Sequence, residues 1–338
     1  MNKEALTEWF SLSEQNRLNI FAETANRMNL PPSAVEKDWW VVRTLELVFL
    51  TEIAPFTVFK GGTSLSKAWN LINRFSEDID LALDRKFLDF PEEMTRSQVA
   101  KLRRKSQEYI SVKYLPQLQR VFHDAGFTEV TLQLTEIKSP DEDPVKIEVI
   151  YPALTEKSDY LDQRVLIEIG SRSLIEPYTF RQIVSFVGEQ FPGSAFSDAG
   201  TGIPTVNPER TFLEKIFLLH EEFQQSLDKI KVERISRHLY DIERMMDTGF
   251  GTKALTDHVL YDHIVEHRKT ITPLRGIDYA HHVPARINPL PPDDLIDEVR
   301  KDYEQMRQSM VFTESLPFDM LMDRISELKN RINTMSHG

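Results

Sequence analysis

The segment 58–83, VFKGGTSLSKAWNLINRFSEDIDLAL, places two glycines before a helix-like run and two aspartates on an apolar, strand-like run. Side chains alternate between the faces of a strand, so Asp78 and Asp80 are expected on one face and Ile79 on the other. Adjacent carboxylates repel each other, and a hard divalent cation such as Mg²⁺ or Mn²⁺ relieves that repulsion. Taken alone, an Asp-x-Asp pattern favours the simpler interpretation that both side chains face water.

The glycine pair changes that balance. Gly61 and Gly62 follow a strand-like run and precede Thr63 and Ser64, which are expected to open a helix. Such a turn lets a ligand approach the backbone closely and leaves amides for an anion, although an isolated Gly-Gly pair is usually an ordinary tight turn. A phosphate-binding turn close to metal-binding carboxylates favours a site for a metal–nucleotide complex.

A third carboxylate would complete a two-metal site. Glu148 in VKIEVIY and Glu168 in VLIEIG are the two acids on strand-like runs. Either could simply face solvent on its strand, and Glu168 is the preferred ligand.

The rest of the chain shows two styles of sequence. Residues 1–50 have helical spacing of apolar side chains, and short β-rich runs alternate with helix-like runs from about 57 to 187, which indicates an α+β or α/β fold. The stretch 191–209, FPGSAFSDAGTGIPTVNPE, is typical of a linker or long loop. Asn207-Pro208 is predicted to start a helix, and the remainder is predicted to be mostly helical.

Composition narrows the possible function. The 338 residues carry a net charge of −12 and contain no cysteine, which excludes disulfides, thiolate metal sites and thiol nucleophiles. There is no signal-peptide core and no apolar stretch that could span a bilayer, so a cytoplasmic protein is predicted. A nucleic-acid partner would need a local basic patch, and the best stretches are 96–114 and 228–238. Both are mixed with acids, so a solvated surface is an equal alternative.

Four motifs together resemble those of the nucleotidyltransferase-like AbiEii/AbiGii toxins, the toxin halves of type IV toxin–antitoxin and phage-defence pairs. KGGTSLSKAW and RFSEDIDLAL are similar to the first two motifs of that family, and PERTFLEKIFLLHEE and SRHLYDIERM to the third and fourth. The resemblance implies an α+β fold: a nucleotidyltransferase domain with a mixed sheet and N-terminal helices over 1–200, and a mostly helical domain over 201–338.

The resemblance also implies roles for individual residues. The segment Gly61–Ser64 would hold the triphosphate, and Asp78 and Asp80 would bind the metal. The strand acid that precedes the third motif aligns with Glu168. In the later motifs, Lys215 would meet the nucleotide phosphates, and Asp241 would be an acid required for activity.

The residues alone allow simpler roles for the last two. Lys215 could be a solvated lysine, and Asp241 could pair with Arg237 or Arg244 on its own helix. Neither lies on the apolar stripe of its helix, so replacing either is expected to affect stability little.

The implied activity is metal-dependent transfer of a nucleotide from an NTP to an acceptor hydroxyl, with Mg²⁺ or Mn²⁺ as cofactor. The expected acceptor is a tRNA 3′ end, with arrest of translation as the consequence, and a cognate antitoxin is an expected partner. One alternative is transfer to a protein hydroxyl, such as one on that antitoxin. Another is an inactive nucleotidyltransferase fold that serves as a binding module.

Overall fold

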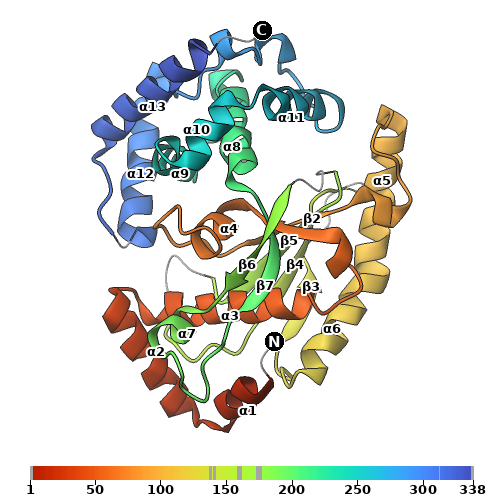
Figure 1. The fold of residues 1–338 in the computed structure, drawn as a ribbon, viewed down its shortest axis with the longest axis vertical. Coiled ribbons are helices and arrows are strands. Elements are labelled where there is room, and N and C mark those ends of the chain that lie inside the picture. The colour runs from red at the N-terminus through yellow and green to blue at the C-terminus, as the bar shows by residue number, and fades with distance from the viewer. Residues whose placement is uncertain are drawn as a thin grey trace. The chain divides into compact units, whose positions relative to one another are not determined.

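The computed structural model describes residues 3–136, 139, 142–157, 162–172, 177–311 and 313–335. They form two compact units (Figure 1). The first contains Met1–Trp69 and Phe75–Val206, and the second contains Asn70–Arg74 and Asn207–Gly338. Compared with the predicted division at 200/201, the second unit begins later and also takes in the short segment before the Asp-x-Asp run.

The first unit contains one sheet of seven strands in the order β3-β4-β5-β2-β1-β7-β6. The β1/β7 and β2/β5 pairs are parallel and the other neighbouring pairs are antiparallel, so the sheet is mixed and the predicted α+β class is confirmed. The strands are β1 (Thr57–Lys60), β2 (Ile79–Leu83), β3 (Thr131–Leu134), β4 (Val145–Ile150), β5 (Arg164–Gly170), β6 (Tyr178–Ile183) and β7 (Thr201–Val206).

One face of this sheet packs on helices to form the core. Alternate residues of β5, including Ile167 and Ile169, are fully buried against the same apolar cluster as Trp39 and Leu45 of the third helix, α3. Figure 1 shows α3 lying across the sheet. The helices of this unit are α1 (Lys3–Ser11), α2 (Glu14–Met28), α3 (Pro32–Val48), α4 (Gly61–Lys67), α5 (Arg96–Tyr109), α6 (Leu115–Asp124) and α7 (Phe186–Gln190).

The sequence-based expectation of a loop over 191–209 is wrong in part, because β7 lies inside it. Gly202 and Pro204 gave this stretch the character of a turn. The strand forms because β6 pairs along its whole length, while its register with β1 is limited to Phe59 opposite Thr205. A short ladder on that side tolerates a proline, which has no amide hydrogen to donate.

The second unit is helical. Helix α8 begins at Pro208 with Asn207 at the N-cap position, which confirms the predicted helix start. The described helices are α8 (Pro208–Glu222), α9 (Ser236–Met246), α10 (Gly249–Thr256), α11 (His258–Thr270), α12 (Ile296–Met310) and α13 (Phe318–Asn333). Helix α9 packs against α8, α10, α12 and α13, so its side chains are at the centre of this unit.

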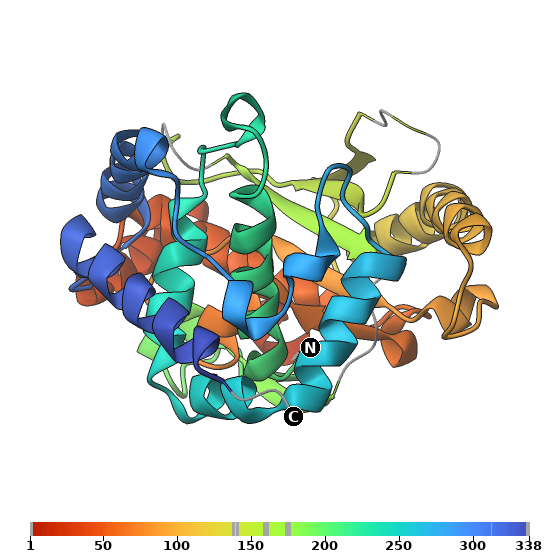
Figure 2. The same cartoon turned by 90° about the horizontal axis from the view of Figure 1, so that it is seen from above.

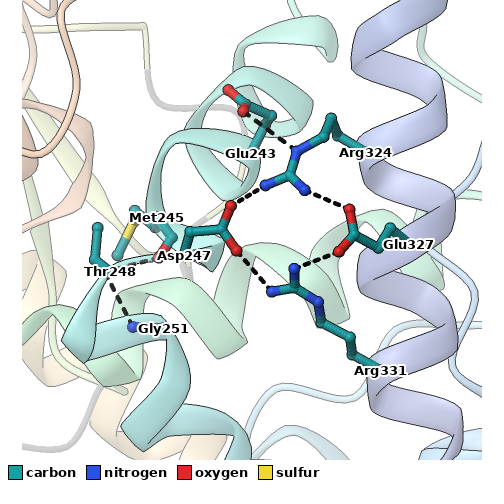
Figure 3. Close-up of polar contacts among 8 residues, drawn as sticks. All are labelled: Glu243, Met245, Asp247, Thr248, Gly251, Arg324, Glu327 and Arg331. Atoms are coloured by element: carbon teal, nitrogen blue, oxygen red, sulfur yellow. Dashed lines mark hydrogen bonds and ion pairs between the residues drawn. The ribbon is translucent and has the colours of Figure 1, made fainter.

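A network of ion pairs fastens α13 to the C-terminal end of α9 (Figure 3). Asp247 accepts from Arg331 at 2.7 Å and also pairs with Arg324. Both arginines bind Glu327 on their own helix, and Arg324 lies 3.9 Å from Glu243.

Among the described residues, none of the helices is both long enough and apolar enough to cross a membrane.

Candidate active site

The Gly-Gly turn connects β1 directly to α4. Helix α4 begins at Gly61, two residues earlier than predicted, and Gly61 has a φ of +79°, a conformation that disfavours residues with a Cβ. A Cβ at this position would lie 1.9 Å from Oδ2 of Asp80. Glycine is therefore required here for two reasons, the backbone conformation and the close approach of the Asp80 carboxylate.

The hydroxyls of the turn contact the protein itself. Thr63 and Ser64 are buried; Oγ1 of Thr63 donates to the carbonyl of Asp78 at 2.5 Å, and Oγ of Ser64 donates to the carbonyl of Gly61 at 2.8 Å. Thr63 thus holds the turn against the chain that enters β2, and Ser64 closes the turn on itself. Triphosphate binding by residues 61–64 stays a prediction, and the backbone is the part of the segment best suited to it.

The predicted strand over 78–83 is confirmed from Ile79 to Leu83, with Asp78 directly before its first residue. Ile79 and Leu81 are buried in the core, whereas Asp78 and Asp80 are half-buried. The carboxylate of Asp80 therefore lies on the face of the sheet opposite the core.

Four charged residues form a row across four neighbouring strands on this face. Asp80 of β2 is opposite Lys60 of β1 on one side and opposite Glu168 of β5 on the other, and Glu168 is opposite Lys146 of β4. Nζ of Lys146 lies 2.5 Å from Oε1 of Glu168. The row thus reads Lys, Asp, Glu, Lys, with two adjacent carboxylates flanked by a lysine at each end.

The other acid considered from the sequence has a different environment. Glu148 of β4 is opposite Leu166 in the register with β5. Its carboxylate pairs with Arg164 and accepts from Nε2 of Gln133 at 2.9 Å. Of the two glutamates, Glu168 is the one that lies opposite Asp80, and its role as a metal ligand stays a prediction.

No group of three or more His, Asp or Glu side chains within the described ranges is arranged to hold a metal ion. The donor set nevertheless suits one, because the register brings Asp80 and Glu168 side by side and Asp78 is two residues from Asp80. Carboxylate oxygens are the ligands that Mg²⁺ and Mn²⁺ prefer.

Helix α3 fixes the chain on both sides of these carboxylates. Residues Ala34–Val48 are all buried, including charged ones, which the amphipathic pattern of the sequence did not indicate. Successive helix residues point about 100° apart. Three consecutive charged side chains, Glu36, Lys37 and Asp38, can therefore reach three different segments of the unit.

Each of the three has a defined partner. Glu36 accepts from the amides of Leu154 and Thr155, after β4. Nζ of Lys37 lies 2.5 Å from Oε2 of Glu77, the residue before Asp78.

Asp38 lies 2.8 Å from Nζ of Lys67, the last residue of α4. Burial raises the pKa of Asp38, and the Lys67 charge opposes this rise. Lys37 and Asp38 thus hold the chain next to the Asp-x-Asp run and the far end of the helix that follows the glycines.

In the second unit, Lys215 and Asp241 form one buried ion-pair network with Arg74. Nε and Nη2 of Arg74 donate to the two Asp241 oxygens at 2.7 and 2.8 Å. Nζ of Lys215 lies 2.9 Å from Oδ2 of Asp241. Burial would raise the pKa of Asp241, but the charges of Arg74 and Lys215 outweigh it and hold that pKa well below its usual range.

This network corrects three expectations. Lys215 is 7% exposed, so it is not a solvated lysine, and Asp241 is fully buried. The partners of Asp241 are Arg74 and Lys215 rather than Arg237 or Arg244. Replacing Asp241 would leave two buried cations without their counter-charge, so the expected small effect on stability does not hold.

Sequence reasoning missed Arg74. It lies within the second motif, RFSEDIDLAL, four residues before Asp78, and its place in that motif was the available signal. The catalytic roles of Lys215 and Asp241 stay predictions.

Comparisons with known proteins agree with this architecture. The family model for the nucleotidyl transferase AbiEii toxins of type IV toxin–antitoxin systems matches residues 46–324. No curated protein matches the chain.

Among solved structures, the chain is similar to MenT4, the nucleotidyltransferase toxin Rv2826c from Mycobacterium tuberculosis H37Rv, with 16% identity and a TM-score of 0.51 over 94% of this chain and 90% of that one. JHP933 from Helicobacter pylori matches with 15% identity and a TM-score of 0.37, over 88% of this chain and 91% of that one. The first similarity extends over nearly the whole chain and concerns the fold.

Proposed function

The chain belongs to the AbiEii family of nucleotidyl transferase toxins of type IV toxin–antitoxin systems, and we propose that it transfers a nucleotidyl group from an NTP to the 3′-terminal hydroxyl of a tRNA. The observation that carries the proposal is the pair of adjacent carboxylates, Asp80 and Glu168, beside the Gly61 turn. A tRNA extended at its 3′ end could not be charged with an amino acid, so translation would stop. The proposed setting is the cytoplasm, with a cognate antitoxin as partner.

The reaction is a displacement at the α-phosphorus. The acceptor oxygen forms a bond to that phosphorus, the bond to the bridging oxygen breaks, pyrophosphate leaves, and the hydroxyl proton passes to solvent. Asp78, Asp80 and Glu168 would hold Mg²⁺ or Mn²⁺. When bound, such an ion neutralises charge on the phosphates and lowers the pKa of the acceptor hydroxyl.

The chain's own residues have separable tasks in this proposal. Gly61 lets the Asp80 carboxylate lie directly against the turn, because any side chain there would occupy the space of that carboxylate. The carboxylate thereby stays beside the backbone that is proposed to hold a phosphate. Lys60 and Lys146 flank the carboxylates and limit their mutual repulsion before substrate binds. Lys146 must release Glu168 in part if that carboxylate is to hold a cation.

Lys215 and Asp241 are proposed to take part in the reaction, Lys215 by offsetting phosphate charge and Asp241 by holding Lys215. The ion pair between Lys215 and Asp241 supports the second role.

The test is incorporation of label. The purified protein is incubated with Mg²⁺, a deacylated tRNA pool and each α-labelled NTP in turn, and the RNA 3′ ends are sequenced. We expect one or more NTPs to extend tRNA, and Asp80→Asn to abolish extension while leaving the fold intact. Glu148→Gln is the matched control, because it removes a strand carboxylate away from Asp80.

A parallel reaction contains the cognate antitoxin in place of RNA. Label in the protein and none in RNA would favour the alternative acceptor, a protein hydroxyl. Absence of label from both, with every NTP, would contradict nucleotidyl transfer and favour a binding module.

A further inference from the structure

Helices α5 and α6 form a basic rod on the first unit. The five residues Ile110–Tyr114 between them form a π-helical turn, so the helical run is continuous from Arg96 to Asp124. Pro116 lies two residues after this turn. Because proline has no amide hydrogen to donate to the carbonyl four residues earlier, the regular helical hydrogen-bond pattern is interrupted here. At 1.5 Å per residue the rod is about 43 Å long. Figure 2 shows it, in amber and yellow, at the outer side of the sheet.

The charge of the rod is opposite to that of the protein. Residues 96–124 contain seven Lys or Arg and two Asp or Glu, a balance of 7 − 2 = +5, whereas the whole chain carries −12. The rest of the chain therefore carries −12 − 5 = −17. A polyanion would be repelled by most of the surface and attracted by this rod.

Six of the seven basic residues are exposed, and Arg103 is half-buried. In the ranges that the structure describes, five of them have no ion-pair or hydrogen-bond partner: Arg96, Lys101, Arg104, Lys113 and Arg120. Lys105, by contrast, lies 3.1 Å from Oδ2 of Asp89. Five unpaired cations on one element, in a protein with an excess of acid, leave room for an external anion to neutralise them.

The opposite side of the rod is already used. Leu102, Ile110, Tyr114, Leu118 and Phe122 are at most 1% exposed and belong to the core cluster of the unit. The rod therefore cannot insert an apolar face into a membrane. Nor does its outer side offer the aromatic, apolar centre that protein interfaces use.

We propose that the exposed side of the α5–α6 rod binds the sugar–phosphate backbone of the RNA acceptor. This inference rests on the proposed function in that the RNA is the substrate of the same protein. Its recognition is electrostatic and independent of base sequence, because lysine and arginine side chains on a helix surface contact phosphates rather than read base edges. The rod would thus determine affinity for RNA in general and leave the choice of acceptor to other residues.

The test is equilibrium binding of the full chain to a fluorescein-labelled deacylated tRNA pool, without NTP, at several salt concentrations. The variant is Lys101→Gln/Arg104→Gln/Lys113→Gln. Loss of three phosphate contacts should reduce the slope of log K against log salt by about 2 to 3, and weaken binding by about 100-fold at 0.1 M salt. The conservative variant Lys101→Arg/Arg104→Lys/Lys113→Arg should bind as the wild type does.

The control variant is Lys157→Gln/Arg286→Gln/Lys301→Gln. It removes three exposed cations outside the rod and changes the net charge equally, so its binding should be close to that of the wild type. Circular dichroism of each variant checks that the fold is retained.

Three results would overturn the inference. The first is wild-type protein that does not bind the tRNA pool, and the second is a rod variant that binds the pool as the control variant does. The third is a rod variant that still binds tRNA but no longer binds polyglutamate, an acidic polypeptide used as a second probe, because this would indicate an acidic protein partner. The proposed function is tested separately, because binding is measured without NTP. If the wild type extends RNA and the rod variant binds RNA as the wild type does, the role of the rod is refuted and the transfer reaction is not. If RNA binding depends on the rod but no RNA is extended, the transfer reaction is refuted and the role of the rod is not.

Discussion

Removal of the Asp241 carboxylate should destabilise the second unit strongly. In Asp241→Ala, Arg74 and Lys215 keep their buried positions but lose the anion that both contact within 3 Å. Breaking a buried ion pair by removing one partner costs about 3–5 kcal/mol. Small domains have a total stability of about 5–15 kcal/mol, so the variant would lose a large share of it.

The measurement is urea unfolding followed by circular dichroism, with the change in free energy taken from the midpoints at equal slope. Asp247→Ala is the matched control. It removes an acid at the C-terminal end of the same helix, but one whose side chain is 56% exposed, so it should cost less than about 1 kcal/mol.

A triple replacement separates charge from volume. Arg74→Met/Lys215→Met/Asp241→Leu removes every charge of the network together, and well-packed apolar replacements of buried ion pairs are often neutral in stability. We expect it to recover most of the loss while remaining inactive.

An Asp241→Ala variant that loses less than about 1 kcal/mol would refute the buried network. A triple variant as unstable as Asp241→Ala would show that shape, rather than charge, accounts for the loss.

The remaining predictions concern the first unit and the ion pairs between Asp247, at the end of α9, and α13. Gly61→Ala should abolish nucleotidyl transfer and lower stability by more than Gly193→Ala, because both glycines have φ near +80° but only at Gly61 would a Cβ meet another residue; equal losses in urea unfolding would exclude the contact with Asp80 as the cause. Glu168→Gln should reduce turnover far more than Glu148→Gln in the extension assay, and the reverse ranking would move the third ligand to Glu148. Finally, hydrogen bonding to Arg331 and the charge of Arg324 lower the pKa of Asp247 in the folded protein. The ionised carboxylate therefore stabilises the fold at pH values above the pKa that Asp247 has in the unfolded chain. This contribution is lost as the pH falls below about 4. The stability difference between wild type and Asp247→Asn, under about 1 kcal/mol at pH 7 for a surface pair, should therefore shrink in acid; a difference that grows in acid would contradict the assigned pairing.

Local features of this protein followed from the sequence alone. The alternation around Ile79 gave the strand, the glycine pair gave the turn, and Asn207-Pro208 gave the start of α8. Each depends on neighbouring residues only: on side-chain alternation, on backbone conformation, or on the first turn of a helix. The order of four such motifs was enough to predict the family.

Tertiary structure decided which of these residues meet. Asp241 is paired with Arg74, 167 residues earlier, and no local pattern distinguishes that partner from Arg237 or Arg244 on the same helix. Glu168 became the neighbour of Asp80 through the register of β2 with β5. A shift of one residue would have turned its side chain to the other face.

The same cause explains β7. A stretch containing Gly202 and Pro204 has the local character of a loop, and it is a strand only because β6 supplies hydrogen-bonding partners along its whole length. Sequence thus determined the chemistry of the candidate site and the elements that carry it. Strand pairing and burial, which depend on residues far apart in the chain, determined which carboxylates are adjacent and which charges are buried together.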